Sequence, residues 1–578
     1  MVGFVSRQGD CLRAAAPGVE GTAAPENAAQ VRPNGAPGEP SAHLRERVER
    51  NPNDGVLATR HADALQEEAQ LVEAAAEYRR ALDLDEALVD AWYGLGRVEL
   101  DLGAAGEARR CFRRALALAP GRATAHFNLG RALFDLGEID AALDHVRAAA
   151  DGPDPELRHK ALGVMALIMP GSPRADHAAV LQTRRAWAEL EAAREVPVKP
   201  SIPRPAAASG KLRLGYCSKF FLARNWMKPV WGVINHHDRS AFEIHLFSDG
   251  KPPRAECGYQ ASPLDHVHDA RGLSNADLAS LVARTGIDIL VDLNGYSFQS
   301  RLGLFMRRPA PVNVAWFNMY ATSGVDAFDY IIGDAAVIPA AEEPFYGERV
   351  LRVPGSYLAY SVLYPVPDVV SPPCLATGRI TFASLCSQYK ITDEVIAAWA
   401  VILQEAPHSQ LLIKNAALGD PTNCAALLER FGRWQIAPNR ILLEGPAPHK
   451  EFLAAYDRAD IALDTFPYNG GTTTSEALWQ GVPVLTFNGD RWASRQGRSL
   501  LLAAGLDDWC MPDRGAYIAR AISLARSPAT PAKLASLRAT MRERLARSPA
   551  CDSAGLCRAL EDIYRKVVKE IVSFVPPA

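Results

Sequence analysis

The sequence predicts an α plus α/β protein, in which a helical repeat arm is followed by two doubly wound α/β lobes. Small and aromatic residues recur at a fixed interval before residue 196, a proline-rich segment follows, and short β-rich runs then alternate with helical stretches in two successive rounds. Such recurrence is typical of stacked helix pairs, and the alternation is typical of parallel sheets. The expected parts are a disordered segment 1–41, repeats and degenerate helices 42–195, a linker 196–210, a first lobe 211–375 and a second lobe 376–578.

The repeat is clearest in residues 91–120, and a second copy follows at Leu129, Gly130 and Gly137. The interval of about 34 residues is the tetratricopeptide period. Small Ala and Gly side chains let two helices approach, and an aromatic ring fills the space between them. We therefore expect a short tetratricopeptide solenoid. The matching positions of the first copy are Trp92, Leu95, Gly96, Gly103, Ala108, Phe112, Ala115 and Pro120.

Charge, hydropathy and cysteine content argue against a nucleic-acid-binding, membrane-spanning or zinc-binding protein. The formal net charge of −3 gives no general attraction for nucleic acid or an anionic membrane. No stretch approaches the roughly 18 apolar residues that a membrane span needs. The ten cysteines are scattered, without a CxxC pair or a Cys/His cluster of zinc-site spacing, so we expect no metal. Isolated cysteines suit a reducing cytosol, and with no signal-peptide pattern we expect a cytoplasmic protein.

Residues 460–487 combine the end of a strand, a glycine-rich turn and the start of a helix. The turn ends at Gly471, and Thr472, Thr473 and Glu476 fall in the first turns of the expected helix. Free backbone N–H groups at a helix start form an anion site, which suits a diphosphate. Glu476 would be able to reach a ribose. Alternatively, Thr473 and Glu476 form an ordinary capping box, and both interpretations stay open.

Three further segments carry candidate residues at the ends of expected strands. Lys390 follows a buried strand and would reach the same diphosphate, unless it is a solvated lysine at a helix start. Arg224 and Lys228 follow the first strand of the first lobe and are candidates to contact phosphate or acceptor. In a third loop, Asn318, Thr322 and Ser323 hold the sugar or the acceptor, or form a purely structural loop.

These segments together resemble the family of O-GlcNAc transferase and SPINDLY, closest to SPINDLY and its bacterial relatives. The matching stretches are RPAPV (308–312), LDTFPY (463–468), TTTSEALWQGVPVLT (472–486) and RSPACDS (547–553). The resemblance implies a GT-B region of two Rossmann-like domains after the repeats. It also implies a nucleotide-sugar site. In that site Lys390 binds the diphosphate, and Gly471, Thr472 and Thr473 form the phosphate-binding helix start. Glu476 binds the ribose, His449 and Phe452 flank the base, and Ala447 offers backbone contacts to the base.

The family resemblance implies a protein O-glycosyltransferase. Its reaction would be an inverting, metal-independent transfer to Ser or Thr of a protein docked by the repeats, with no cofactor besides the nucleotide-sugar donor. The base is left open between a donor phosphate oxygen and a carboxylate such as Asp334. Only Asn128 occupies the repeat position at which longer relatives carry a peptide-gripping Asn, because Gly94 stands there in the preceding repeat. We therefore expect the arm to dock one particular partner.

Arg224 departs from the family, which usually has a His at this position. An arginine cannot act as a base near neutral pH, but it can hold a carboxylate in a bidentate contact. One alternative is therefore a flagellin glycosyltransferase that uses a CMP-activated nonulosonic acid. Another is a scaffold that has kept the fold and lost the chemistry.

Overall fold

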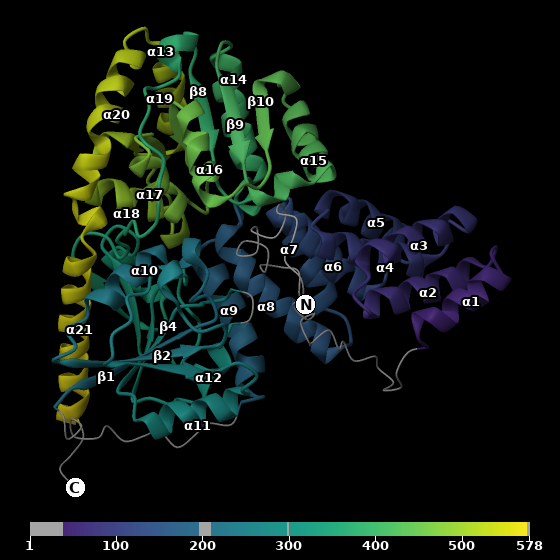
Figure 1. The fold of residues 1–578 in the computed structure, drawn as a ribbon, viewed down its shortest axis with the longest axis horizontal. Helices are drawn as coiled ribbons and strands as arrows, with labels where there is room; N and C mark the ends of the chain where they lie inside the picture. Colours follow the sequence, from purple (N-terminus) through teal and green to yellow (C-terminus); the bar gives the residue numbers. More distant parts are fainter. Residues whose placement is uncertain (1–38, 196–209, 298–299, 575–578) are drawn as a thin grey trace.

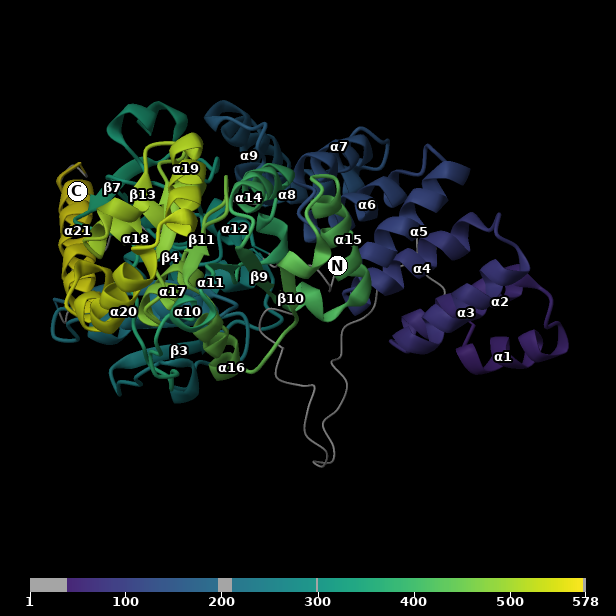
Figure 2. The same ribbon diagram turned by 90° about the horizontal axis from the view of Figure 1, so that it is seen from above.

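The computed structural model describes residues 39–195, 210–297 and 300–574. A helical arm leans against two stacked α/β lobes (Figure 1), and from above its first helices extend away from the lobes (Figure 2). The predicted fold class, repeats followed by two Rossmann-like lobes, is confirmed. The expected disorder before residue 39 and the linker 196–209 lie outside the described residues, and helix α1 begins at Ser41. Within the described residues, no helix is both long enough and apolar enough to cross a bilayer.

The arm consists of antiparallel helix pairs that pack through their small residues. A Cβ atom added at Gly96 would lie 2.6 Å from the ring of Phe112, so only glycine lets these two helices approach. Gly103 ends its helix in the left-handed conformation with φ of 85°. These contacts confirm the predicted repeat. The helices are α1 (Ser41–Arg50), α2 (Gly55–Glu67), α3 (Leu71–Leu84), α4 (Val89–Leu102), α5 (Ala105–Leu118), α6 (Ala123–Asp135), α7 (Ile139–Ala150), α8 (Pro155–Ile168) and α9 (His177–Ala192), with the 3-10 turn η2 (Met169–Gly171).

The first lobe is built on a seven-stranded parallel sheet with the order β3-β2-β1-β4-β5-β6-β7 among the described residues. Its central strands are buried on both faces, as expected for a sheet covered by helices. The strands are β1 (Leu212–Ser218), β2 (Phe242–Ser248), β3 (Asp265–Asp269), β4 (Ile289–Asp292), β5 (Val312–Ala315), β6 (Tyr330–Asp334) and β7 (Arg349–Val353). The helices are α10 (Arg224–His236), η3 (Ala255–Cys257), α11 (Asn275–Thr285), α12 (Leu302–Met306) and η4 (Ala340–Phe345).

The second lobe repeats this plan with a six-stranded parallel sheet of order β10-β9-β8-β11-β12-β13 in the described part of the chain. The strands are β8 (Thr381–Ser384), β9 (Gln410–Lys414), β10 (Ile441–Glu444), β11 (Ile461–Leu463), β12 (Val484–Phe487) and β13 (Cys510–Met511). The helices are α13 (Cys374–Thr377), η5 (Gln388–Lys390), α14 (Asp393–Glu405), η6 (Ala416–Gly419), α15 (Pro421–Gly432), η7 (Pro438–Arg440), α16 (His449–Ala454), η8 (Ala455–Arg458), α17 (Thr472–Trp479), η9 (Trp492–Ser494), α18 (Gln496–Ala503), η10 (Asp507–Trp509), α19 (Arg514–Arg526) and α20 (Thr530–Ala546).

The last helix, α21 (Ser553–Phe574), returns to the first lobe after the turn η11 (Pro549–Cys551). Leu560 and Tyr564 are buried in the core of the first lobe, and Figure 1 shows α21 alongside its sheet. The expectation that residues 376–578 all form the second lobe is therefore wrong for this helix. Its amphipathic pattern is visible in the sequence, but the pattern does not say which lobe receives the apolar face.

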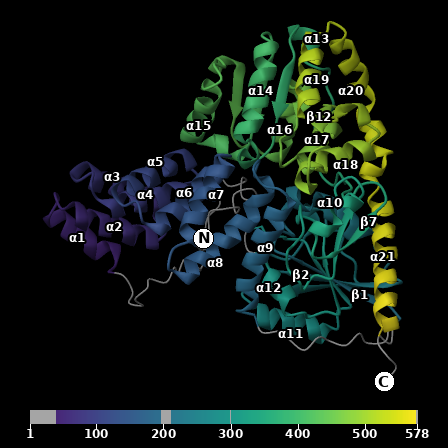
Figure 3. The same ribbon diagram turned by 180° about the vertical axis from the view of Figure 1, so that it is seen from behind.

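The arm is fixed to both lobes, as the view from behind in Figure 3 also shows. The fully buried Arg184 of α9 donates hydrogen bonds to the carbonyl oxygens of Ala166, Met319 (3.1 Å) and Thr322 (2.6 Å). On the second lobe, the Asn423 amide bonds to the backbone of the arm at Gly103 and Gly106. The arm is thus held at a fixed position relative to the lobes.

We expect Arg184→Met to destabilise the protein by roughly 3 kcal/mol, because it leaves buried carbonyl groups of both the arm and the first lobe without donors. The measurement is urea denaturation followed by circular dichroism. Arg185→Met is the matched control, since Arg185 is the exposed neighbour on the same helix. Equal stability of the two variants would contradict the claim that Arg184 holds the arm in place.

Candidate functional site

The glycine-rich turn is folded back onto its own strand by a buried carboxylate. Asp464, directly after β11, accepts hydrogen bonds from the backbone N–H of Gly470 (2.7 Å), from that of Thr465 (3.0 Å) and from the hydroxyl of Thr486 (2.9 Å). Burial raises the pKa of Asp464 to about 6, although these hydrogen bonds and Lys390 oppose the shift. Gly497 packs against the carboxylate where a Cβ would clash. The end of the turn is therefore held in one place.

Lys390 lies beside this turn. It ends η5, shortly after the buried strand β8, and its Nζ donates a hydrogen bond of 2.8 Å to the carbonyl oxygen of Asn469. The same Nζ lies 4.0 Å from the centre of the Tyr468 ring, a cation–π contact. Burial lowers the pKa of Lys390 to about 8, against the opposing charges of Cys386 and Asp464. The lysine is therefore held at the turn, and the alternative of a solvated helix-start lysine is wrong.

Helix α17 begins at Thr472, with Gly471 preceding it. The first N–H groups of a helix have no partner within the helix, so they carry partial positive charge. Thr472 and Thr473 are half-exposed at this end. A Cβ added at Gly471 would lie 3.1 Å from Gln496 Oε1 and 3.9 Å from Leu358, which belongs to the first lobe's core. The helix start therefore faces the boundary between the lobes.

The capping-box alternative for Thr473 and Glu476 is wrong. The helix starts one residue before Thr473, and the Glu476 carboxylate turns to the other lobe. There it forms a buried ion pair with Lys228 of α10. His449 Nε2 lies 2.9 Å from Lys228 Nζ and 3.5 Å from Glu476 Oε1. Lys228 also lies 4.3 Å from the centre of the Tyr364 ring. The lobes are thus joined at the residue predicted to bind ribose.

The predicted base-flanking residues lie next to this ion pair. His449 and Phe452 share the short helix α16, and their rings are nearly parallel, with centres 6.4 Å apart and planes 18° apart. Tyr364 meets His449 edge-on at 5.0 Å. Ala447 lies two residues before α16 and is half-buried. The structure therefore brings His449 and Glu476 together, with Phe452 beside His449, as expected for one binding site.

The residues predicted for the sugar and acceptor side make internal contacts. The Thr322 hydroxyl donates to Glu348 Oε2 at 2.7 Å, and the Ser323 backbone N–H bonds to the other oxygen of Glu348. Asn318, with a left-handed φ of 68°, donates from its amide to the carbonyl of Asn294 at 2.7 Å. All three residues are buried. These contacts fit the structural-loop interpretation, and the predicted contact with sugar or acceptor stays a prediction.

The Asp334 carboxylate is fully engaged in hydrogen bonds, which disfavours it as a base. Its carboxylate accepts from three backbone N–H groups and, at 2.7 Å, from the hydroxyl of Ser499 in the second lobe. Arg224 begins α10, but its side chain lies outside the described residues. Its predicted contact with an acidic sugar therefore stays a prediction.

Sequence reasoning missed that the arm reaches this site. Phe134 of α6 stacks on Tyr389 with ring centres 4.9 Å apart, and Tyr389 directly precedes Lys390. The ring centre of Tyr389 lies 6.0 Å from that of Tyr468, whose ring contacts Lys390. An aromatic at the end of a repeat helix gives no sign of this partner, because the contact joins residues far apart in the chain.

Comparison with known proteins identifies the family. Residues 196–361 and 373–560 match glycosyl transferase family 41, and residues 59–121 and 105–156 match a tetratricopeptide repeat family. The chain belongs to glycosyl transferase family 41. The predicted resemblance is thereby confirmed.

Individual relatives of this family 41 chain include plant proteins and a bacterial one. A probable UDP-N-acetylglucosamine–peptide N-acetylglucosaminyltransferase SPINDLY from Solanum lycopersicum is 32% identical over 365 residues, covering 62% of this chain and 38% of the relative. The SPINDLY protein of the same name from Arabidopsis thaliana is 31% identical, and the match covers 40% of that relative's length. A solved lysine-to-methionine mutant of the Thermobaculum terrenum O-GlcNAc transferase matches with a TM-score of 0.74 and 31% identity, over 92% of this chain and 98% of that one. The chain thus spans well under half of these plant relatives.

We expect Glu476→Gln to destabilise the protein by about 3 kcal/mol, since it leaves the Lys228 charge buried without its carboxylate. Urea denaturation measures the change. The double variant Lys228→Met with Glu476→Gln should lose less than the sum of the single variants. The matched control is Glu49→Gln, which removes an exposed pair with Arg45 at 3.5 Å and should change stability by under about 0.5 kcal/mol. Additive losses in the double variant would contradict the coupling between the lobes.

Proposed function

We propose that this chain transfers a sugar from a nucleotide-activated donor to a Ser or Thr hydroxyl of a protein docked by the arm. The observation that carries the proposal is that Lys390 and the start of α17 converge on one turn at the boundary between the lobes. A cationic side chain and a helix start together suit a phosphate, which is the leaving group of such a donor.

Relatives support the reaction class. Both plant relatives carry names for transfer of N-acetylglucosamine from UDP-N-acetylglucosamine to peptide, and the solved bacterial relative is called an O-GlcNAc transferase. We propose the same kind of donor, a nucleoside diphosphate sugar, as the first to test. The acidic-donor alternative, with flagellin as acceptor, rests on Arg224 alone.

The proposed reaction is a direct displacement at the anomeric carbon, with inversion and without a metal or a further cofactor. The acceptor oxygen forms the new bond as the bond to the donor phosphate breaks. Lys390 and the α17 N–H groups take up the charge that develops on the departing phosphate. Because the Asp334 carboxylate is engaged in four hydrogen bonds, we assign the acceptor proton to a donor phosphate oxygen.

Donor binding requires a rearrangement at Glu476. A ribose can hydrogen-bond to this carboxylate only if Lys228 moves away from at least one of its oxygens. The side chains of Lys228 and Glu476 are nearly fully buried, at 2% and 4% exposure, so the ion pair leaves no room for another partner. The released ammonium group would lie close to the donor's own phosphates. The ion pair thus holds the lobes together without donor, and the donor replaces it.

The arm contacts the proposed donor site directly, so it can place a docked protein near the reacting groups. Phe134 contacts Tyr389, next to Lys390, so a protein bound along the arm is held at a fixed distance from the phosphate site. This favours a protein acceptor over a small one, which needs no docking arm. It also disfavours a scaffold without chemistry, because Lys390 keeps its place at the turn.

We expect Lys390→Met to reduce transfer by roughly 10²- to 10³-fold, since the charge on the leaving phosphate loses its cation. The assay is intact-mass spectrometry of a candidate partner incubated with the enzyme and UDP-, GDP- or CMP-sugars. Lys533→Met, an exposed lysine on α20, is the matched control and should keep full activity. Unchanged transfer by Lys390→Met would overturn the assigned role, and no transfer from any donor would overturn the function.

Donor binding should weaken as pH rises through about 8, the pKa of Lys390 in the free protein. Below this pH the lysine is charged and binds phosphate, and above it the lysine loses its proton. Calorimetry should therefore give up to about tenfold weaker affinity at pH 9 than at pH 7. Lys390→Met should bind weakly at both values. A wild-type affinity that does not change between them would contradict the assignment.

A further inference from the structure

A second group of polar side chains lies at the edge of the first lobe's sheet, away from the proposed donor site. Glu243 and His245 are two residues apart on β2, so they share one face of the strand. His245 pairs in register with His266 on the edge strand β3. Three side chains of metal-ligand type therefore meet on one face, across two neighbouring strands.

The distances between these groups are those of metal ligands. The rings of His245 and His266 stack, with centres 4.6 Å and planes 17° apart, so the half-exposed His266 ring must turn for both nitrogens to point at one ion. Glu243 Oε1 lies 3.3 Å from His245 Nε2 and 3.2 Å from His266 Nε2. Ligand atoms bound at 2.0–2.1 Å to a tetrahedral zinc ion lie roughly 3.3–3.4 Å apart. The other carboxylate oxygen, Oε2, accepts from Arg213 Nε at 3.3 Å, which orients the group and leaves Oε1 for an ion.

His245 Nε2 is the independent sign that a ligand is needed. The His245 side chain is only 4% exposed, and its Nε2 makes no well-aligned hydrogen bond, with the Glu243 carboxylate as its neighbour at 3.3 Å. Buried polar atoms are rarely left in this state. The opposite ring nitrogen, Nδ1, lies 3.0 Å from His268 Nε2, a contact that fixes the orientation of the ring. A cation between Nε2 and the carboxylate would satisfy the orphaned atom.

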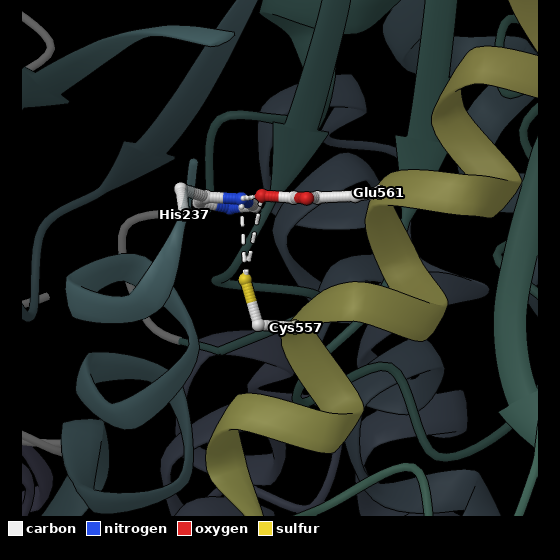
Figure 4. A group of neighbouring side chains, drawn as sticks. All are labelled: His237, Cys557 and Glu561. Carbon is white, nitrogen blue, oxygen red and sulfur yellow. Dashed lines mark hydrogen bonds and ion pairs between the residues drawn. The ribbon is translucent and has the colours of Figure 1, made fainter. Parts of the chain in front are cut away.

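Another group of side chains with metal-ligand spacing contains no histidine nitrogen that lacks a hydrogen bond. His237, Cys557 and Glu561 lie together between the end of α10 and α21, as Figure 4 shows. There His237 Nδ1 bonds to Glu561 at 3.0 Å, and Nε2 bonds to the Tyr216 hydroxyl at 2.7 Å. Both ring nitrogens have partners, so this group is satisfied as a buried hydrogen-bond network and needs no ion.

We propose that Glu243, His245 and His266 form a binding site for one zinc-class divalent cation at the β2–β3 edge. The His266 side chain is 49% exposed, so an ion can enter from solvent and keep a water molecule as its fourth ligand. Two imidazoles and one carboxylate suit zinc and its neighbours in the first transition row rather than calcium or magnesium. The site ties the edge strand to its neighbour and takes no part in the proposed transfer.

The test is calorimetric titration of the chelator-treated full-length protein with Zn²⁺, together with elemental analysis of the metal bound per chain. We expect one ion per chain, and at least about tenfold weaker binding in His266→Ala and in Glu243→Gln. His266 is on the half-exposed edge strand, and circular dichroism checks that His266→Ala is folded. His408→Ala, at an exposed histidine of the second lobe, is the matched control and should bind as the wild type does.

Co²⁺ substitution separates the two groups of ligands. The proposed site contains no sulfur, so the cobalt spectrum should lack a thiolate charge-transfer band, and Cys557→Ser should leave binding unchanged. The proposal is overturned if the wild type binds no stoichiometric ion, if His266→Ala binds equally well, or if a thiolate band appears and disappears with Cys557→Ser.

Discussion

The candidate site depends on the buried carboxylate of Asp464. By accepting the N–H of Gly470 at 2.7 Å, it bends the chain back at the end of β11. That bend turns the Asn469 carbonyl toward Lys390 and directs the start of α17 to the boundary between the lobes. Two sources of positive potential, an ammonium group and a helix start, are thereby fixed beside each other. Their combination, rather than either one alone, is what supports the proposal that the turn binds a phosphate.

The surrounding contacts act on this arrangement from two directions. Across the lobe boundary, Lys228 forms an ion pair with Glu476, so the lobes are held together at the residue that is predicted to bind ribose. From the arm, Phe134 packs against Tyr389 and Arg184 holds the loop of Thr322. The arm, the loop of Thr322 and the turn beside Lys390 are therefore connected through buried contacts whose geometry is fixed.

Much of the fold and part of the site could be predicted from the sequence. Repeat spacing and strand texture gave the arm and the two lobes, because both patterns are local. Lys390 and Thr472 were predicted together since each follows a buried strand. The Lys228–Glu476 pair could not be foreseen, because its members are 248 residues apart and on different lobes. The packing of α21 on the first lobe could not be predicted either, because the apolar face of this helix fits the core of either lobe. The capping box failed because α17 begins at Thr472, two residues earlier than a motif with Thr473 at the N-cap requires.

The central claim is that the α17 start and Lys390 together hold the leaving phosphate. The most direct measurement is a crystal structure of the protein soaked with a nucleoside diphosphate. The account predicts a phosphate within hydrogen-bond distance of Lys390 Nζ and of the backbone N–H groups of Thr472 and Thr473, with Lys228 moved away from Glu476. A nucleotide bound elsewhere, with the Lys228–Glu476 pair intact, would contradict it.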